Sequence, residues 1–252
     1  MRLIIFLLLL LCAYGFLMLY AYVMVDRHLY FPPQLSFQKP DNMIEIKVAK
    51  DAHITALYFT RPGAQKTIIY SHGNAEDLYY LQRLAPHILS QGFNVLLYDY
   101  EGYGHSSGKP SQKALYRDAL AAYDYIHKEK QVSQEDIVVM GHSLGSAAAL
   151  YMGVHRAPAK VVLLSPFLSV FRVVTYVPLL PFDYFNNAKL IKQLHRPVSI
   201  IHGSADTIIA PYHAKVLYQL ANEPKSLDII PGAHHNNILG QLRASFWKQL
   251  LQ

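Results

Sequence analysis

Cysteine is nearly absent from this chain: Cys12 is the only one among 252 residues, and it lies in an apolar stretch near the amino terminus. A single thiol excludes a disulfide within the chain and a thiolate metal site. N-x-Ser/Thr sequons are also absent, so the sequence offers no acceptor for N-glycosylation. Runs of five or more basic residues are missing too, although lysine and arginine outnumber aspartate and glutamate by 23 to 17. Because nucleic-acid-binding surfaces cluster their basic residues, we expect no nucleic-acid partner.

What the sequence does contain is a long apolar run. From Leu3 to Val25 it has 23 residues without a charge, and about 20 apolar residues suffice to cross a bilayer. We therefore expect residues 1–25 to form an N-terminal, single-pass membrane anchor, with the lipid bilayer as its partner. A cleaved signal peptide is the alternative, because Ala13-Tyr14-Gly15 has the small-x-small pattern of a cleavage site. Ten more apolar residues follow that site, which favours the uncleaved anchor.

The charges at the two ends of the apolar run do not agree on which side of the membrane the domain lies. Arg2 favours an amino terminus on the inner side, whereas Arg27 and Lys39 lie beyond the other end of the run. Large domains are translocated largely regardless of such charges. The interpretation therefore leans towards an exported domain and leaves the side open.

Beyond the anchor, short apolar runs rich in β-branched residues alternate with helical stretches. Residues 26–53 predict a linker and a lead-in strand, in which Ile44, Ile46 and Val48 alternate with charged residues. Strands alternating with helices indicate a mainly parallel central sheet with helices on both faces, which is an α/β fold. Residues 54–252 predict this single domain, with strands at 54–59, 67–70, 93–98, 137–140, 161–164, 198–201 and 227–230 and helices that include 76–90, 113–130 and 237–250.

The most informative stretch joins the strand at 137–140 to a run of strong helix formers. Between them stands Gly-His-Ser-Leu-Gly at 141–145, a Gly-x-Ser-x-Gly motif. In a tight strand–turn–helix connection this motif exposes the hydroxyl of Ser143 as a nucleophile. Gly141 and Gly145 allow strand and helix to approach closely. The N–H of Leu144, at the start of the helix, can stabilise an oxyanion.

A serine nucleophile needs a base, and the base needs an orienting acid. Ser143, Asp206 and His235 each follow a predicted strand, and they stand in the chain order Ser, acid, His. Ligands of open parallel sheets bind outside the carboxyl ends of the strands. We therefore expect these three side chains to meet at that edge.

At this point the chain resembles the α/β-hydrolases, specifically the membrane-anchored serine hydrolases related to acyl-protein thioesterases and to the serine aminopeptidase-like group. The resemblance implies an α/β-hydrolase fold with a short cap insert, no metal and no organic cofactor. It also implies that His72 shapes the oxyanion loop and that the N–H of Asn74 joins that of Leu144 in the oxyanion hole. The matching motifs cover nearly all of residues 54–250 and are Ser-His-Gly-Asn at 71–74, Asp-Tyr-Glu-Gly-Tyr-Gly at 99–104, the serine motif at 141–145, Ser-Pro-Phe at 165–167, His-Gly with Asp at 202–206, and Pro-Gly-Ala-His-His-Asn at 231–236.

Two other aspartates compete with Asp206 for the role of the acid. An Asp after a strand is often only a turn or cap residue, but Asp206 follows His-Gly, where the family carries its acid. Asp183 lies in the insert, and Asp228 lies inside a predicted strand. We therefore assign the acid to Asp206.

His234 competes with His235 for the role of the base. The family pattern Gly-His-Asn-Asp places its histidine directly before Asn, which favours His235. His234 and Asn237 stand where the family usually has Gly and Asp, so the conformation of this loop is an open point. A further departure is Glu101, where relatives usually carry Arg, and the sequence offers no physical reason for it.

The insert between Pro166 and Leu194 is rich in Phe, Val and Leu. It is either ordinary helix core or an apolar wall over the active site that accepts an acyl chain, with Phe167, Leu168 and Val174 contacting the substrate.

Taken together, the sequence features predict a membrane-anchored Ser-His-Asp hydrolase of ester or thioester bonds, acting on acylated lipids or proteins through an acyl-enzyme. An aminopeptidase or amidase on the same fold is one alternative. A non-catalytic scaffold is another, against which the intact Ser, Asp and His argue.

Overall fold

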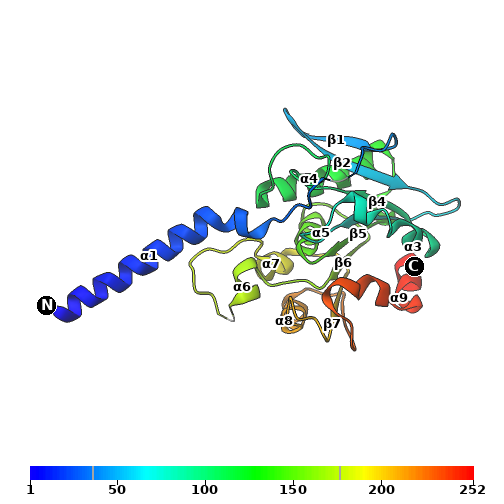
Figure 1. The fold of residues 1–252 in the computed structure, drawn as a ribbon. Helices are drawn as coiled ribbons and strands as arrows, with labels where there is room; N and C mark the ends of the chain where they lie inside the picture. The colour runs from blue at the N-terminus through cyan, green and yellow to red at the C-terminus, as the bar shows by residue number, and fades with distance from the viewer. Residues whose placement is uncertain (36, 176) are drawn as a thin grey trace.

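The computed structural model describes residues 1–35, 37–175 and 177–252. Its strands are β1 (Ile44–Ala49), β2 (Ala52–Phe59), β3 (Thr67–Ser71), β4 (Asn94–Tyr98), β5 (Ile137–His142), β6 (Lys160–Leu164), β7 (Val198–Gly203) and β8 (Lys225–Ile230). They form an eight-stranded sheet in the order β1-β2-β4-β3-β5-β6-β7-β8 (Figure 1). β1 and β2 are antiparallel, as are β2 and β4, whereas all neighbouring pairs from β4 to β8 are parallel. The expected mainly parallel sheet is confirmed.

Helices cover both faces of this sheet. α4, α5, α7 and α8 contribute to the core on one face, and α2, α3 and α9 contribute to the core on the other. Strands with cores on both faces are mostly apolar, and in β3, β4 and β5 every residue is buried. The helices are α1 (Arg2–Leu29), α2 (Leu78–Leu81), α3 (Ala85–Ser90), α4 (Gln112–Asp124), α5 (Leu144–His155), α6 (Val170–Val174), α7 (Asn187–Leu190), α8 (Tyr212–Leu220) and α9 (Ala244–Leu251), with 3-10 turns at Gln134–Asp136, Ile191–Gln193 and His235–Gln241 and a π turn at Tyr125–Glu129.

Two helices expected to be continuous are broken in the structure. The segment 76–90 forms α2 and α3, because Pro86 near the start of α3 has no N–H to continue the hydrogen bonding of a preceding helix. The segment 237–250 forms a 3-10 turn and then α9, with Gly240, a weak helix former, near the break.

The predicted division of the chain into an anchor (1–25), a linker with a lead-in strand (26–53) and a hydrolase domain (54–252) stays a prediction. In the sheet, Ile46 of β1 is the partner of Ile54 in β2.

α1 projects from the domain, with the amino terminus at its far end (Figure 1). By length and composition it is the one helix in the described part of the chain that could cross a membrane. It continues four residues beyond the predicted end of the anchor and stops before Pro32 and Pro33. Its middle and its carboxyl-terminal half touch the insert, because Tyr14 Oη donates to the carbonyl of Leu179 at 2.8 Å and the Tyr22 ring packs edge-on to Phe182.

Glu101, the departure noted in the sequence, is 4% exposed and pairs with the guanidinium of Arg117. Its backbone N–H donates to the carboxylate of Asp118 at 2.9 Å. A buried carboxylate is costly unless its charge is compensated. Arg117, which lies on α4, therefore explains how position 101 tolerates a glutamate where relatives usually carry an arginine.

Candidate active site

Ser143 stands at a strained turn between β5 and α5. Its backbone has φ +53° and ψ −118°, a conformation that few residues with a side chain adopt. Its N–H donates to the carbonyl of Leu164 at 2.9 Å, which ties the turn to β6. A Cβ on Gly141 would lie 2.0 Å from the Gly145 carbonyl oxygen, and one on Gly145 would lie 2.1 Å from that of Ser71. Only glycine therefore lets the strand and helix approach closely enough to form this turn.

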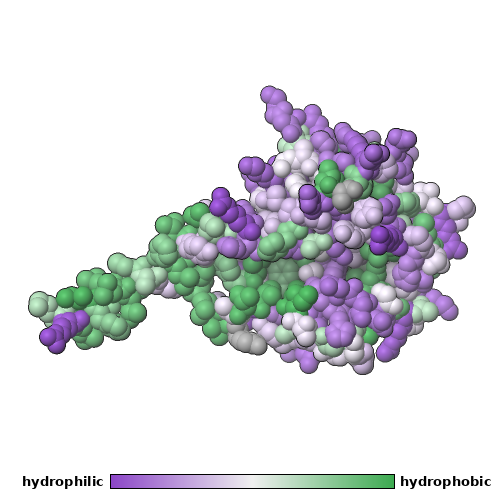
Figure 2. All heavy atoms as spheres, in the orientation of Figure 1, coloured by the Kyte–Doolittle hydropathy of each residue, from purple (hydrophilic) through white to green (hydrophobic). Residues whose placement is uncertain are grey.

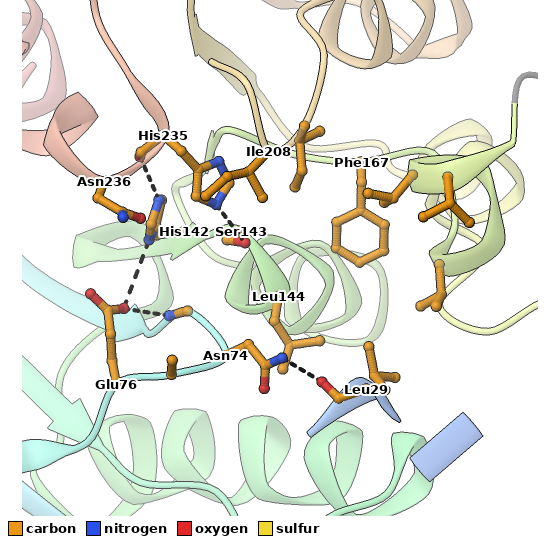
Figure 3. A pocket seen from close by; sticks show the side chains of 16 residues that line it. Leu29, Asn74, Glu76, His142, Ser143, Leu144, Phe167, Ile208, His235 and Asn236 are labelled. Carbon is orange, nitrogen blue, oxygen red and sulfur yellow. Dashed lines mark hydrogen bonds and ion pairs between the residues drawn. The ribbon is translucent and has the colours of Figure 1, made fainter. Parts of the chain in front are cut away.

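The structure brings the three side chains named from the sequence together. His235, the first residue of the 3-10 turn after β8, has its Nε2 2.9 Å from Ser143 Oγ. Its Nδ1 lies 2.7 Å from Oδ2 of Asp206, which follows β7. His235 and Asp206 are each 6% exposed. The resulting chain of hydrogen bonds joins the segments after the carboxyl ends of β5, β7 and β8, and Figure 3 shows its link between His235 and Ser143.

Asp206 is held as a carboxylate. Burial alone would raise its pKa, but hydrogen bonds from His202, His235 and the N–H of Ile209 hold that pKa well below its usual value. The N–H groups of Ile208 and Ile209 donate to Oδ1 at 2.9 and 2.8 Å, which leaves Oδ2 facing the imidazole of His235. An ionised acid on Nδ1 favours the tautomer whose Nε2 is free to accept a proton.

His234 has a different setting from its neighbour. It is exposed, its Nδ1 lies 3.0 Å from the carbonyl of Ala205, and its N–H donates to Oδ1 of Asn237 at 2.8 Å. The Asn237 side chain thus caps the turn that presents His235. This hydrogen bond defines the conformation of the loop that carries His234 and Asn237, which the sequence left open.

The opposite wall of the site is the loop after β3. Leu144 is the first residue of α5, and Asn74 lies on this loop; both line the cavity. Within the described residues, neither backbone N–H has a hydrogen-bond partner. The side chain of Asn74 is engaged elsewhere: it donates to the carbonyl of Leu29 and accepts from the N–H of Phe31 at 3.0 Å and from Tyr103 Oη at 2.7 Å. His72 is fully buried, with Nδ1 2.6 Å from the Gly73 carbonyl, as expected of a residue that shapes the loop.

Sequence reasoning missed a pair of residues behind the base, Glu76 and His142. His142 Nε2 lies 2.9 Å from the carbonyl of His235, and its Nδ1 lies 3.8 Å from Glu76 Oε2 (Figure 3). That same oxygen accepts the N–H of Gly73 at 2.7 Å. Burial alone would raise the pKa of Glu76, but His142 and the Gly73 N–H lower it to about 2. His142 is the variable residue of the serine motif, whereas nothing in the sequence pattern singles out Glu76.

The side chains of Ser143 and His235 open into a cavity of about 610 Å³, a size suited to a small-molecule ligand. Phe167 and Val174, two of the three residues proposed from the sequence to contact substrate, line this cavity. Leu168, grouped with them, is instead 3% exposed in the core, and its N–H donates to His213 Nδ1, so its side chain packs away from the cavity. Further apolar lining comes from Leu29, Val170, Val173, Ile208 and Ile209. In the described ranges, no three His, Cys, Asp or Glu residues are grouped so as to hold a metal.

Comparisons with known proteins agree with this architecture. The family described as serine aminopeptidase, S33, matches residues 62–182. A Mycobacterium tuberculosis protein of uncharacterised function is 33% identical over 225 residues, which are 84% of this chain and 80% of that protein. Human alpha/beta hydrolase domain-containing protein 17B is 33% identical over 198 residues, 76% of this chain and 67% of that protein.

Solved structures show the same fold at lower identity. An esterase of Pyrococcus furiosus has a TM-score of 0.70 at 18% identity, covering 88% of this chain and 96% of that one. A monoacylglycerol lipase of Paleococcus ferrophilus has a TM-score of 0.61 at 18% identity, covering 79% of this chain and 98% of that one. The protein is therefore a hydrolase of the α/β class. The chain belongs to the α/β-hydrolase superfamily, which confirms the resemblance at that level.

Proposed function

We propose that this protein is a membrane-anchored serine hydrolase of carboxylic ester or thioester bonds. One observation carries the proposal: Ser143 Oγ, His235 and Asp206 form a continuous chain of hydrogen bonds of 2.9 and 2.7 Å. The serine end of that chain lies in a largely apolar cavity. A nucleophile in contact with a base, and a base oriented by an acid, are the arrangement that acyl transfer requires.

In the proposed reaction, Ser143 Oγ attacks the substrate carbonyl while His235 Nε2 takes the hydroxyl proton. Asp206 orients the imidazole and stabilises its protonated form. The N–H groups of Leu144 and Asn74 bind the oxyanion of the tetrahedral intermediate. His235 then returns the proton to the leaving alcohol or thiol as the bond to the acyl carbon breaks. Water attacks the acyl-enzyme by the same steps and releases the free acid.

The apolar side of the cavity supports an acyl group as the part of the substrate that the enzyme recognises. Phe167 and Val174 line this side, and α1 contributes Leu29. We propose that α1 stays attached as an anchor, because Val25 is 7% exposed and Tyr14 is bonded to the insert. Substrates held at the same bilayer, acylated lipids or proteins, would then be near the site.

Labelling with a fluorophosphonate probe tests the proposal. The probe should react covalently with the wild-type protein and with Ser90→Ala, a control at an exposed serine. It should not react with Ser143→Ala, which should also lose at least about 1000-fold in ester turnover, as broken triads do. Unchanged labelling or turnover in folded Ser143→Ala would refute the assignment.

A second candidate, an aminopeptidase, is favoured by one feature of the cavity. Glu76 lines the cavity and is held ionised, so it could pair with the ammonium group of a peptide's amino terminus. The matching family is also described as serine aminopeptidase. Aminoacyl p-nitroanilides separate the two candidates, because an aminopeptidase should cleave them and spare their N-acetylated forms, and Glu76→Gln should abolish that preference.

A further inference from the structure

A second cavity of about 410 Å³ lies between α1 and the insert. Its walls are almost wholly apolar: one is the carboxyl-terminal half of α1, and the other is α6 with the residues that follow it. Leu29, Val170 and Val174 line both this groove and the cavity at Ser143. The two cavities are therefore adjacent, and an apolar path leads from the side of α1 towards the nucleophile.

The contact between Tyr14 and Leu179 fixes how far this groove reaches along α1. Tyr14 precedes Val25, the last residue of the uncharged run, by 11 residues, which is about 16 Å along a helix. If α1 spans a bilayer with a hydrocarbon core of about 30 Å, Tyr14 lies near its middle. The insert residue bonded to Tyr14 must then lie inside the hydrocarbon as well.

The insert has the composition that such a position requires. Val174, Val177 and Leu179 are 81%, 58% and 56% exposed, a density of exposed apolar side chains that marks an interaction surface. Figure 2 shows that the apolar surface of α1 continues onto the adjoining part of the domain. Backbone polar groups must be satisfied in lipid. The carbonyl of Leu179 accepts from Tyr14, and Pro178 and Pro181 have no N–H to satisfy.

We propose that the insert dips into the bilayer beside α1, and that the groove between them admits the acyl chain of a bilayer lipid to Ser143. This inference rests on the proposed function and narrows its substrate class to lipid esters. Leu29, which lines the cavity at Ser143, lies four residues, or about 6 Å, beyond Val25. The interfacial layer on each side of the hydrocarbon is about 5–8 Å thick. A lipid already holds its ester bond at this depth, so only its chain has to enter the groove.

Depth-dependent quenching tests the position of the insert. A fluorophore is attached at Leu179→Cys in the full chain, with Cys12→Ala to remove the native thiol, in phosphatidylcholine vesicles that contain nitroxide-labelled lipid. Nitroxides on the acyl chains should quench it more than nitroxides on the headgroups. The same label at Gln65→Cys, an exposed site on the domain, should be quenched by neither. Stronger quenching of the Leu179 label from the headgroups would overturn the proposal.

Obstruction of the groove tests its use by the acyl chain. Ala21→Trp fills the groove from a position that does not itself line the cavity at Ser143. It should lower kcat/KM for 1-palmitoylglycerol in phosphatidylcholine vesicles at least tenfold, yet leave 1-butyrylglycerol within twofold. Leu19→Trp is the matched control, because Leu19 is 60% exposed and points about 200° around the helix from Ala21. It should change neither rate.

The outcomes separate this inference from the proposed function. Equal losses on both glycerolipids, or no loss on the palmitoyl ester, would overturn the groove as the acyl path. Cleavage of an S-palmitoylated peptide with no cleavage of palmitoyl glycerolipid would overturn the lipid assignment and leave the esterase chemistry intact. Absence of any fluorophosphonate labelling would instead refute the proposed function, and the quenching measurement would still report the depth of the insert.

Discussion

The polar and apolar sides of the active-site cavity are built in opposite ways. Ser143, Asp206 and His235 lie in the segments that follow strands of one sheet, and Asp206 and His235 are each 6% exposed. Much of the apolar side comes from the short α6 and from the end of α1, and Val174 of α6 is 81% exposed. Groups that must be placed to within a fraction of an ångström are therefore held by the rigid sheet. Groups that only have to be apolar lie on segments outside it.

The largest effects should come from the polar side, where neighbouring residues can be told apart. His235→Ala should lose at least about 1000-fold in kcat, the size of loss seen when a triad member is removed. His234→Ala should keep most of its activity, because its exposed imidazole bonds backbone groups of a surface loop and does not contact Ser143 or Asp206 in the described structure. Steady-state kinetics on a p-nitrophenyl ester measure both variants. The reverse result would shift the base by one residue.

A backbone change should break the polar side without removing a reactive group. Gly145→Ala places a methyl group 2.1 Å from the Ser71 carbonyl oxygen, so α5 must move away from β3 and carry Ser143 with it. We expect a loss of about 100-fold in kcat, since misplacement by 1 Å costs that much. Gly240→Ala is the control, because a methyl group at that position would have nothing within 4 Å. Circular dichroism checks that both variants fold, and wild-type kcat in Gly145→Ala would contradict the steric argument.

An intermediate effect on kcat is expected for Glu76, which lies behind His235. Glu76→Gln keeps the shape of the side chain but removes the charge that faces His142, which is hydrogen-bonded to the carbonyl of His235. We expect kcat to fall about tenfold, or about 1.4 kcal/mol in activation free energy, with KM for a neutral ester unchanged. A fall in kcat/KM that comes wholly from KM would show that Glu76 binds substrate instead.

The same substitution has a defined pH dependence. The pKa of Glu76 is lowered to about 2 in the folded protein, below its ordinary value of about 4.3. The stability that its charge contributes is therefore complete above that ordinary value and is lost as the pH falls towards 2. Glu76→Gln should be less stable than wild type at pH 7, and the difference in Tm should shrink below pH 4. Thermal melts at pH 3 and pH 7 measure this.

The smallest effect should come from the apolar side. Val174→Ser removes apolar surface at an 81% exposed position, so it should not alter folding. Each buried methylene contributes about 0.8 kcal/mol, so losing part of one contact should lower kcat/KM on a palmitoyl ester two- to fivefold. An acetyl ester should be unaffected. An equal loss on both esters would mean that Val174 acts on the chemical step rather than on the acyl chain.

The contrast between the polar and apolar sides of the cavity also explains how much of the site could be predicted from the sequence. The close approach at Gly141 and Gly145, and the meeting of Ser143, Asp206 and His235, follow from apolar runs and from motifs at strand ends. Glu76 could not be found, because its contacts with Gly73 and His142 depend on how the chain turns after β3. Leu168 was misplaced because composition names the apolar residues of the insert but does not say which side of the backbone each occupies.

Asn74 has a practical consequence for anyone who prepares this enzyme. Its side chain bonds the carbonyl of Leu29, the last residue of α1, and the N–H of Phe31, which lies just after that helix. A version that starts after these residues would therefore lose two of the three hydrogen bonds of the Asn74 side chain, which lies on the loop beside Ser143. Its catalytic rate would describe a loosened loop, and protein that retains α1 is the proper reference for every kinetic comparison.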